Sequence, residues 1–202
     1  MILTTLIATV MVSAPVLAED KPVCCPIMGS AAAAAGSATD YNGVRFRYCC
    51  GGCQATFEKN PEQALKSPKI KDLTTGVSLF DPVAQHSVTA KTAKGGFSDF
   101  NGVRYYFLRP DNKATFDDDP KKYGTPPAKE AMFCPVQKIE LKNYFGCNGY
   151  VDYEGVRYYV CCDTCLGALK ANPANYVANS AASVKAPKAI NVSPELAKVT
   201  GF

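Results

Sequence analysis

The stretch DYNGVRFRYCCGGCQATFEKNPEQAL, residues 40–65, contains the features that decide the fold of this chain. Two short alternating segments flank Asn42-Gly43, and a cysteine-rich turn, a helix-compatible segment and an Asn60-Pro61 step follow. Asn-Gly pairs favour the left-handed backbone conformations of tight hairpin turns, so the stretch is predicted to open with a β-hairpin. A polar residue followed by proline can cap and start a helix, which predicts a second short helix from Asn60-Pro61.

The same pattern occurs three times, at spacings of 59 and 53 residues. The second copy is DFNGVRYYFLRPDNKATFDDDPKKYG at 99–124, and the third is DYEGVRYYVCCDTCLGALKANPANYV at 152–177. A short proline-containing opening precedes each copy: CCPIMG at 24–29, FDPVAQ at 80–85 and FCPVQK at 133–138. The predicted fold class is therefore α+β, with three tandem small units that each hold a β-hairpin and short helices.

The repeat also sets the predicted division of the chain. Residues 1–18 carry no charged side chain and end in Val16-Leu17-Ala18, a small-residue cleavage pattern typical of a secretory signal peptide. This segment is short for an uncleaved anchor, since a spanning helix needs about 20 mostly apolar residues. The expected location is periplasmic or secreted, without membrane insertion after cleavage. The predicted segments are a signal peptide at 1–18, unit 1 at 19–66, unit 2 at 79–124, unit 3 at 131–178 and a flexible tail at 179–202.

Alternation along the second strand of each hairpin predicts which face is buried. In unit 1, Val44, Phe46 and Tyr48 share one face of that strand and are expected in the core. The arginine that follows each hairpin turn falls on the opposite face and is expected to be solvated. These arginines are Arg45, Arg104 and Arg157.

Composition narrows the possible functions. Hydrophobic residues make up 47% and charged residues 20% of the chain, a balance typical of globular proteins. The net charge of +4 is spread along the chain, so no nucleic-acid partner is expected. Ten cysteines stand against one histidine, so any metal site must be built mainly from sulfur. No histidine or glutamate recurs near the cysteines to act as a general base, and the protein is expected not to be an enzyme.

The cysteines fall into two sets of five, one in unit 1 and one in unit 3. A Cys-x-x-Cys turn lets two thiolates converge on one ion, and the hairpin brings a third sulfur back from the opening, as in a zinc knuckle. This argument favours Cys50 with Cys53, and Cys162 with Cys165. The candidate metal ligands are Cys25, Cys49, Cys50, Cys53, Cys134, Cys161, Cys162 and Cys165, with Cys24 and Cys147 as secondary candidates.

The whole order of motifs resembles the YHS/TRASH superfamily. The resemblance rests on a Cys-Pro or Asp-Pro opening, a hairpin with Gly, a Tyr-rich strand, Cys-Cys-x-x-Cys and an Asn-Pro step, over residues 23–64, 79–123 and 132–176. It implies small treble-clef-like zinc fingers that bind or sense heavy metals, often in metal trafficking and resistance. The ligands that it implies are Cys25, Cys49 and Cys53, and Cys134, Cys161 and Cys165. Whether the first or the second cysteine of each Cys-Cys pair is the ligand stays open at this point.

Unit 2 departs from the pattern. Asp81, Leu108, Arg109 and Asn112 occupy its cysteine positions, so it is predicted to bind no soft metal and to be held by its apolar face. A hard-metal site formed by Asp81, His86 and Asn112 is disfavoured, because a lone loop histidine is more often exposed or hydrogen-bonded.

The function expected from the sequence is binding of Zn(II) or Cu(I) through thiolates, in heavy-metal trafficking, buffering or resistance. The expected partners are the heavy-metal ion and a metal transporter or other envelope protein. One alternative is a disulfide-stapled secreted scaffold or interaction protein without metal, although five thiols per unit cannot all pair internally. A further alternative is a thiol-disulfide oxidoreductase, although a hairpin, rather than a thioredoxin-like βαβ unit, precedes each Cys-x-x-Cys.

Overall fold

The computed structural model describes residues 21–33 and 36–199. The predicted signal peptide at 1–18 lies outside these residues. Helices and sheets both occur among them, which confirms the α+β class. Within the described ranges, no helix has the length and apolar character needed to cross a membrane.

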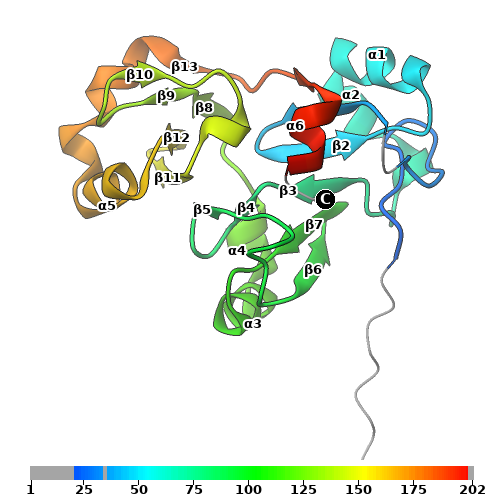
Figure 1. Ribbon diagram of the computed structural model, residues 1–202, viewed down its shortest axis with the longest axis horizontal. Helices are drawn as coiled ribbons and strands as arrows, with labels where there is room; N and C mark the ends of the chain where they lie inside the picture. Colours follow the sequence, from blue (N-terminus) through cyan, green and yellow to red (C-terminus); the bar gives the residue numbers. More distant parts are fainter. Residues whose placement is uncertain (1–20, 34–35, 200–202) are drawn as a thin grey trace, which may run out of the picture.

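The three copies of the repeat form three lobes, with unit 3 on the left of Figure 1, unit 1 at the upper right and unit 2 below. Each contains a hairpin, a first helix and a second short helix. In unit 1 these are β1 (Ala38–Tyr41), β2 (Val44–Arg47), α1 (Gly51–Lys59), α2 (Pro61–Leu65) and the 3-10 turn η1 (Pro68–Ile70). In unit 2 they are β6 (Phe97–Phe100), β7 (Val103–Tyr106), α3 (Pro110–Asp118) and α4 (Pro120–Gly124), after a small hairpin of β4 (Phe80–Asp81) and β5 (His86–Ser87). In unit 3 they are β11 (Gly149–Tyr153), β12 (Val156–Val160), α5 (Asp163–Ala171) and η3 (Pro173–Asn175), after β9 (Phe133–Cys134), β10 (Ile139–Glu140) and η2 (Tyr144–Gly146).

The local signals behave as the sequence predicts. The three hairpin turns hold Asn42, Asn101 and Glu154 at φ values of 52°, 48° and 49°, and the glycine after each also has a positive φ. This left-handed pair is the geometry that an Asn-Gly turn favours. The second short helices begin at the three predicted prolines, and the Asn60 side chain accepts a 3.1 Å hydrogen bond from the backbone N–H of Gln63.

The three units are not structurally independent, because two six-stranded sheets cross the unit boundaries. One sheet has the order β14-β1-β2-β3-β7-β6, and β3 (Gly76–Ser78) in the segment between units joins the hairpins of units 1 and 2. The other has the order β13-β8-β12-β11-β5-β4, in which β8 (Lys129–Ala131) runs parallel to β12 and the small hairpin of unit 2 lies beside β11. Each segment between units thus contributes one strand, β3 or β8, to a shared sheet.

The predicted flexible tail is wrong for most of its length. After η4 (Val177–Ser183), β13 (Val184–Lys185) pairs with β8, and β14 (Ile190–Val192) pairs with β1 of unit 1. The helix α6 (Pro194–Val199) then lies next to β2 (Figure 1), where Arg47 Nη2 donates a 3.0 Å hydrogen bond to the carbonyl of Ala197. An unpaired sheet edge favours the addition of a strand, and composition alone does not reveal such a distant partner.

The prediction of solvated arginines is also wrong. Arg45, Arg104 and Arg157 are buried, and each forms two hydrogen bonds to the aspartate directly across its hairpin. These aspartates are Asp40, Asp99 and Asp152. Each guanidinium group is thus satisfied by a bidentate carboxylate instead of water.

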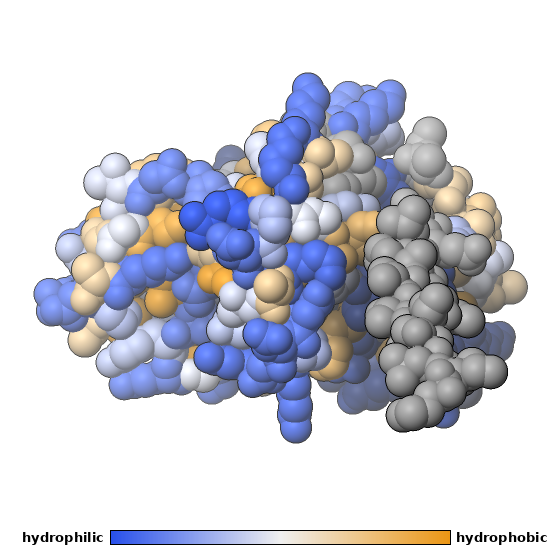
Figure 2. Space-filling model, turned by 90° about the horizontal axis from the view of Figure 1, so that it is seen from below, coloured by the Kyte–Doolittle hydropathy of each residue, from blue (hydrophilic) through white to orange (hydrophobic). Residues whose placement is uncertain are grey.

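The core of each unit forms where the first helix packs on the hairpin. In unit 1 the ring of Phe57, on α1, lies 4.8 Å from that of Phe46, and in unit 2 Phe116 lies 4.9 Å from Tyr105. The surface seen in Figure 2 is mostly hydrophilic with small apolar areas. Two of the large hydrophobic side chains that are exposed lie at the cysteine-bearing openings: Met28 within that of unit 1, and Ile139 directly after that of unit 3.

Candidate metal centres

Each proline-containing opening folds into the same tight turn, which we call the knuckle, at residues 25–29, 81–85 and 134–138. The N–H of its last residue donates to the carbonyl of its first, at 2.9, 2.8 and 2.8 Å in units 1, 2 and 3. The last residue has a positive φ in all three knuckles. The first residue is fully buried in each case: Cys25, Asp81 or Cys134.

The chain then returns to the knuckle from the other side. After the second strand of the hairpin, the first helix begins with a turn that carries the Cys-Cys-x-x-Cys motif. Cys49 and Cys161 stand just before the N-cap residue, and Cys53 and Cys165 lie in the first helical turn, so this segment can direct two sulfurs toward the knuckle. The result is two groups of three sulfurs, each with all its members within 4.8 Å of one another. We call them the N-terminal triad (Cys25, Cys49, Cys53) and the C-terminal triad (Cys134, Cys161, Cys165).

The spacing within the triads fits a coordinated ion better than a covalent bond. The Sγ atom of Cys161 lies 3.6 Å from the Sγ of Cys134 and 3.8 Å from the Sγ of Cys165. The Sγ atoms of Cys49 and Cys53 are also 3.8 Å apart. A disulfide requires about 2.05 Å. All ten cysteines lie in the part of the chain that the structure describes, and all are free thiols there. Tetrahedral bonds of about 2.3 Å from Zn to sulfur would hold the sulfurs about 3.8 Å apart.

The second cysteine of each Cys-Cys pair lies at the edge of its triad. The Cys50 Sγ is 3.4 Å from that of Cys53, and the Cys162 Sγ is 3.0 Å from that of Cys165, but neither joins the group whose members are all mutually close. Cys50 is exposed and Cys162 half-buried. The structure therefore brings together the six cysteines that the YHS/TRASH resemblance implies, and leaves Cys50 and Cys162 as the nearest additional sulfurs.

The two secondary candidates lie outside the triads. Cys24 is buried next to the knuckle of unit 1, where its Sγ lies 3.6 Å from the carbonyl oxygen of Pro22. Cys147 is buried in unit 3, where its Sγ lies 3.5 Å from the carbonyl oxygen of Asn143.

The thiols of a triad do not ionise alike. Burial raises the pKa of the Cys53 and Cys165 thiols, and it raises that of Cys161 to about 11. Burial acts in the same direction on Cys25, but backbone N–H groups, foremost that of Cys49, outweigh it and lower the pKa of this thiol. Several thiolates cannot share a small buried space without a cation, and a bound metal ion supplies that charge.

Unit 2 has a complete hydrogen-bond network at the place of the triad. Asp81 Oδ1 accepts from the backbone N–H groups of Val83 and Ala84, both at 3.0 Å. Its Oδ2 accepts from the N–H of Leu108 at 2.9 Å and from the Asn112 side-chain amide at 2.7 Å. The changed residues are evident in the sequence, but this network was not predicted from it. The signal for it was present, since an acceptor and a donor replace two cysteines that the hairpin brings together.

The disfavoured hard-metal set in unit 2 is not assembled. Asp81 and Asn112 bond to each other, whereas His86 Nε2 lies 2.9 Å from Oδ1 of Asp163, on α5 of unit 3. Asn148 donates to the same oxygen at 2.8 Å. His86 therefore takes part in the contact between units 2 and 3, beside the Cys-x-x-Cys turn of α5.

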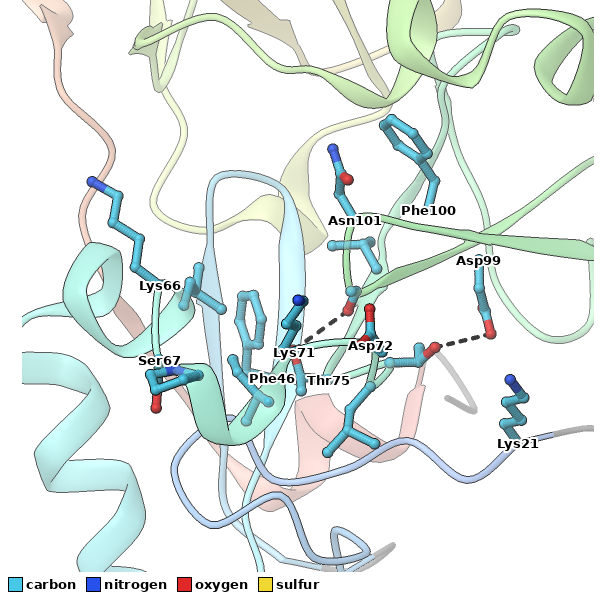
Figure 3. Close-up of a pocket in the computed structure, with 17 residues that line it drawn as sticks. Lys21, Phe46, Lys66, Ser67, Lys71, Asp72, Thr75, Asp99, Phe100 and Asn101 are labelled. Carbon is cyan, nitrogen blue, oxygen red and sulfur yellow. Dashed lines mark hydrogen bonds between the residues drawn. The ribbon is translucent and has the colours of Figure 1, made fainter.

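A cavity of about 820 Å³ lies between units 1 and 2, away from both triads (Figure 3). The exposed side chains of Lys66 and Lys71 stand on one side of it, and the turn that holds Asn101 stands on the other. Its Asp99 is already engaged, because it accepts from Thr74 at 2.9 Å and pairs with Arg104. No cysteine is among the described residues that line this cavity.

Comparisons with protein-family models, with curated proteins and with solved structures find no match to this chain. Among the described residues, the two triads are the groups of at least three cysteine, histidine or acidic side chains that could hold a metal ion.

Proposed function

We propose that this protein binds soft metal ions, one at the N-terminal triad and one at the C-terminal triad. The observation that carries the proposal is the convergence of three sulfurs, from a knuckle and a helix start far apart in the sequence, to within 4.8 Å in two separate units. Each triad contains buried sulfurs surrounded by apolar side chains, which limits access of water to the ion. Its geometry offers the soft ligands and the short sulfur separations that a thiolate-bound ion requires.

Sulfur donors select Zn(II) or Cu(I) over Mg²⁺, Ca²⁺ or Mn²⁺. Three thiolates alone suit Cu(I), whereas a tetrahedral Zn(II) site needs a fourth ligand. A water molecule can take that fourth position, as at zinc sites with three protein ligands, so each triad also suffices for Zn(II). We therefore propose either Zn(II) or Cu(I) as the bound ion.

We further propose that the three units are treble-clef-like zinc-knuckle units of the YHS/TRASH kind. What supports this is the repeated order of knuckle, hairpin, nine-residue helix and short helical turn, with the sulfurs at the positions that the resemblance implies. The corresponding role is non-enzymatic: trafficking, buffering or resistance in the periplasm or outside the cell, with a metal transporter or other envelope protein as partner.

The test is elemental analysis combined with thiol counting on full-length protein purified under reducing conditions. The expected result is about two metal ions per chain. Cys53→Ser and Cys165→Ser should each remove one ion, because each deletes one sulfur of a triad. The matched controls are Cys24→Ser and Cys147→Ser, which remove a buried thiol outside the triads and should keep both ions. Protein that stays metal-free, with its cysteines all paired as disulfides, would instead favour the scaffold alternative.

A further inference from the structure

Each triad has one neighbouring sulfur with a different exposure. Cys50 is exposed and Cys162 half-buried, whereas their nearest sulfur partners, Cys53 and Cys165, are buried members of the triads. These separations, 3.4 Å in unit 1 and 3.0 Å in unit 3, are shorter than the 3.8 Å between Cys49 and Cys53 and between Cys161 and Cys165. In unit 3 the backbone N–H of Cys165 also donates to the Cys162 sulfur at 3.4 Å, which holds it over the start of α5.

This arrangement gives Cys53 and Cys165 two competing partners. Toward the interior, each completes a triad and is needed to hold the ion. Toward the surface, each faces a thiol that a solvent molecule can reach. A bond between the two members of the pair would remove one sulfur from the triad and leave only two thiolates for the ion.

We propose that Cys50–Cys53 and Cys162–Cys165 are reversible disulfide sites, and that forming each disulfide opens the metal site beside it. The inference rests on the proposed function, since it assigns a redox-controlled release to the same triads. The co-reactant is a low-molecular-weight disulfide, which is the oxidant, and a thiol reverses the reaction.

The reaction proceeds by two exchanges. The sulfur of Cys162 attacks one sulfur of the small disulfide, forms a mixed disulfide and expels one small thiolate. The sulfur of Cys165 then leaves the ion with its electron pair and attacks the Cys162 sulfur, which expels the second thiolate. Two electrons pass from the two protein sulfurs to the small disulfide, the Cys162 proton is taken up by a released thiolate, and the metal ion departs with its charge unchanged. Cys50 and Cys53 react in the same way.

Unit 2 lacks both functions together. Arg109 takes the place of Cys50 and Cys162, and Asn112 takes the place of Cys53 and Cys165. Unit 2 can therefore neither bind an ion through thiolates nor form the disulfide. Its Asn112 is bonded to Asp81 and buried. The pairing of a surface sulfur with a triad therefore occurs in units 1 and 3 and not in unit 2.

The experiment uses reduced full-length protein loaded with Zn(II) and then treated with oxidised glutathione. Released Zn(II) is followed with a chromogenic chelator, and the disulfides are located by alkylation and peptide mapping. The expected result is release of two ions together with disulfides at Cys50–Cys53 and Cys162–Cys165, and recovery of both ions after reduction. The double variant Cys50→Ser/Cys162→Ser should keep two ions and release them at least ten-fold more slowly. The control double variant Cys24→Ser/Cys147→Ser should release them at the parent rate.

Three results would overturn the inference. These are release from the Cys50→Ser/Cys162→Ser variant at the parent rate, disulfides mapped to other pairs such as Cys134–Cys161, and loss of both ions from this variant before any oxidant is added. If the parent protein binds no metal at the start, the proposed function and the gating fail together. The peptide map of the same sample then still decides whether the two disulfide pairs form.

Discussion

Units 1 and 2 share the same knuckle and the same helix start, but different side chains fill the space between these two elements. In unit 1, three thiols converge on a point that could hold a metal ion. In unit 2, the carboxylate of Asp81 occupies the knuckle and four donors satisfy it. Three of the four donors are backbone N–H groups, which the fold itself provides. The difference shows that the geometry of the unit does not require sulfur, which agrees with the proposal that the sulfurs of units 1 and 3 serve to hold an ion.

Removal of the bound metal is expected to affect units 1 and 3 far more than unit 2. Structural zinc contributes an apparent ~10 to 16 kcal/mol to the folding free energy of small finger domains. A chelator should therefore loosen units 1 and 3 strongly. Hydrogen exchange of the reduced protein is expected to show lost protection in α1 and α5. Protection in α3 should persist, because its start is held by Asp81. Equal losses in all three helices would contradict the independence of unit 2.

Unit 2 is expected to bind an ion when it is given the missing sulfurs. The triple variant Asp81→Cys/Leu108→Cys/Asn112→Cys places cysteines at the positions of the triads, and elemental analysis should find about one additional ion per chain. The variant Leu108→Cys alone is the matched control, since one thiol beside an intact Asp81 should add none. A triple variant that folds, as judged by circular dichroism, but holds no additional ion would show that the knuckle geometry is not sufficient.

The buried arginines test how far the units differ in their ion pairs. The side chains of Arg45 and Asp40 are both 1% exposed, whereas Asp99 and Asp152 are 29% and 34% exposed. Loss of one partner from a fully buried pair costs about 3 to 5 kcal/mol, and water can compensate the partly exposed aspartates. Urea unfolding should therefore give the largest loss for Arg45→Ala, with smaller losses for Arg104→Ala and Arg157→Ala. A reversed order would refute this reasoning.

The hydrogen-bond network of unit 2 should have a measurable but smaller effect. Asp81→Ala leaves the N–H of Leu108 and the amide of Asn112 without their acceptor, which should cost about 2 to 4 kcal/mol in the free energy of unfolding. The exposed Asp118→Ala, on the same helix, should change stability by less than about 0.5 kcal/mol. Metal content should stay the same in both variants. A cost for Asp81→Ala as small as that of the control would mean that the network does not hold α3 to the knuckle.

The smallest effect expected is that of pH on metal binding. The pKa values of Cys53 and Cys165 are raised by burial, so these thiols hold their protons near neutral pH when no ion is bound. Binding must release those protons, and the affinity should therefore fall as the pH falls, by roughly tenfold or more per pH unit. Competition with a chelator between about pH 6 and 8 measures this slope. An affinity independent of pH in that range would argue against thiol ligands.

Much of the local structure could be predicted because its causes lie close together in the chain. The hairpin turns follow from Asn42-Gly43 and its repeats, and the short helices follow from steps such as Asn60-Pro61. The sulfur positions could also be predicted, since a hairpin necessarily returns the chain to its opening. The sequence did not decide which cysteine of each Cys-Cys pair belongs to the ligand group. Neighbouring residues at a helix start point in different directions, and only the structure assigns Cys49 and Cys161 to the triads.

The sequence by itself determined the repeated unit, its α+β character and the sulfur-rich chemistry of the first and third copies. Only the tertiary structure decided that β3 and the small hairpin of unit 2 join the units through shared sheets, and that β14 returns to pair with β1. It also decided that Arg45 is buried against Asp40. The physical reason is range: turns and caps depend on neighbouring residues, whereas strand pairing and burial depend on surfaces that meet only after the chain has folded.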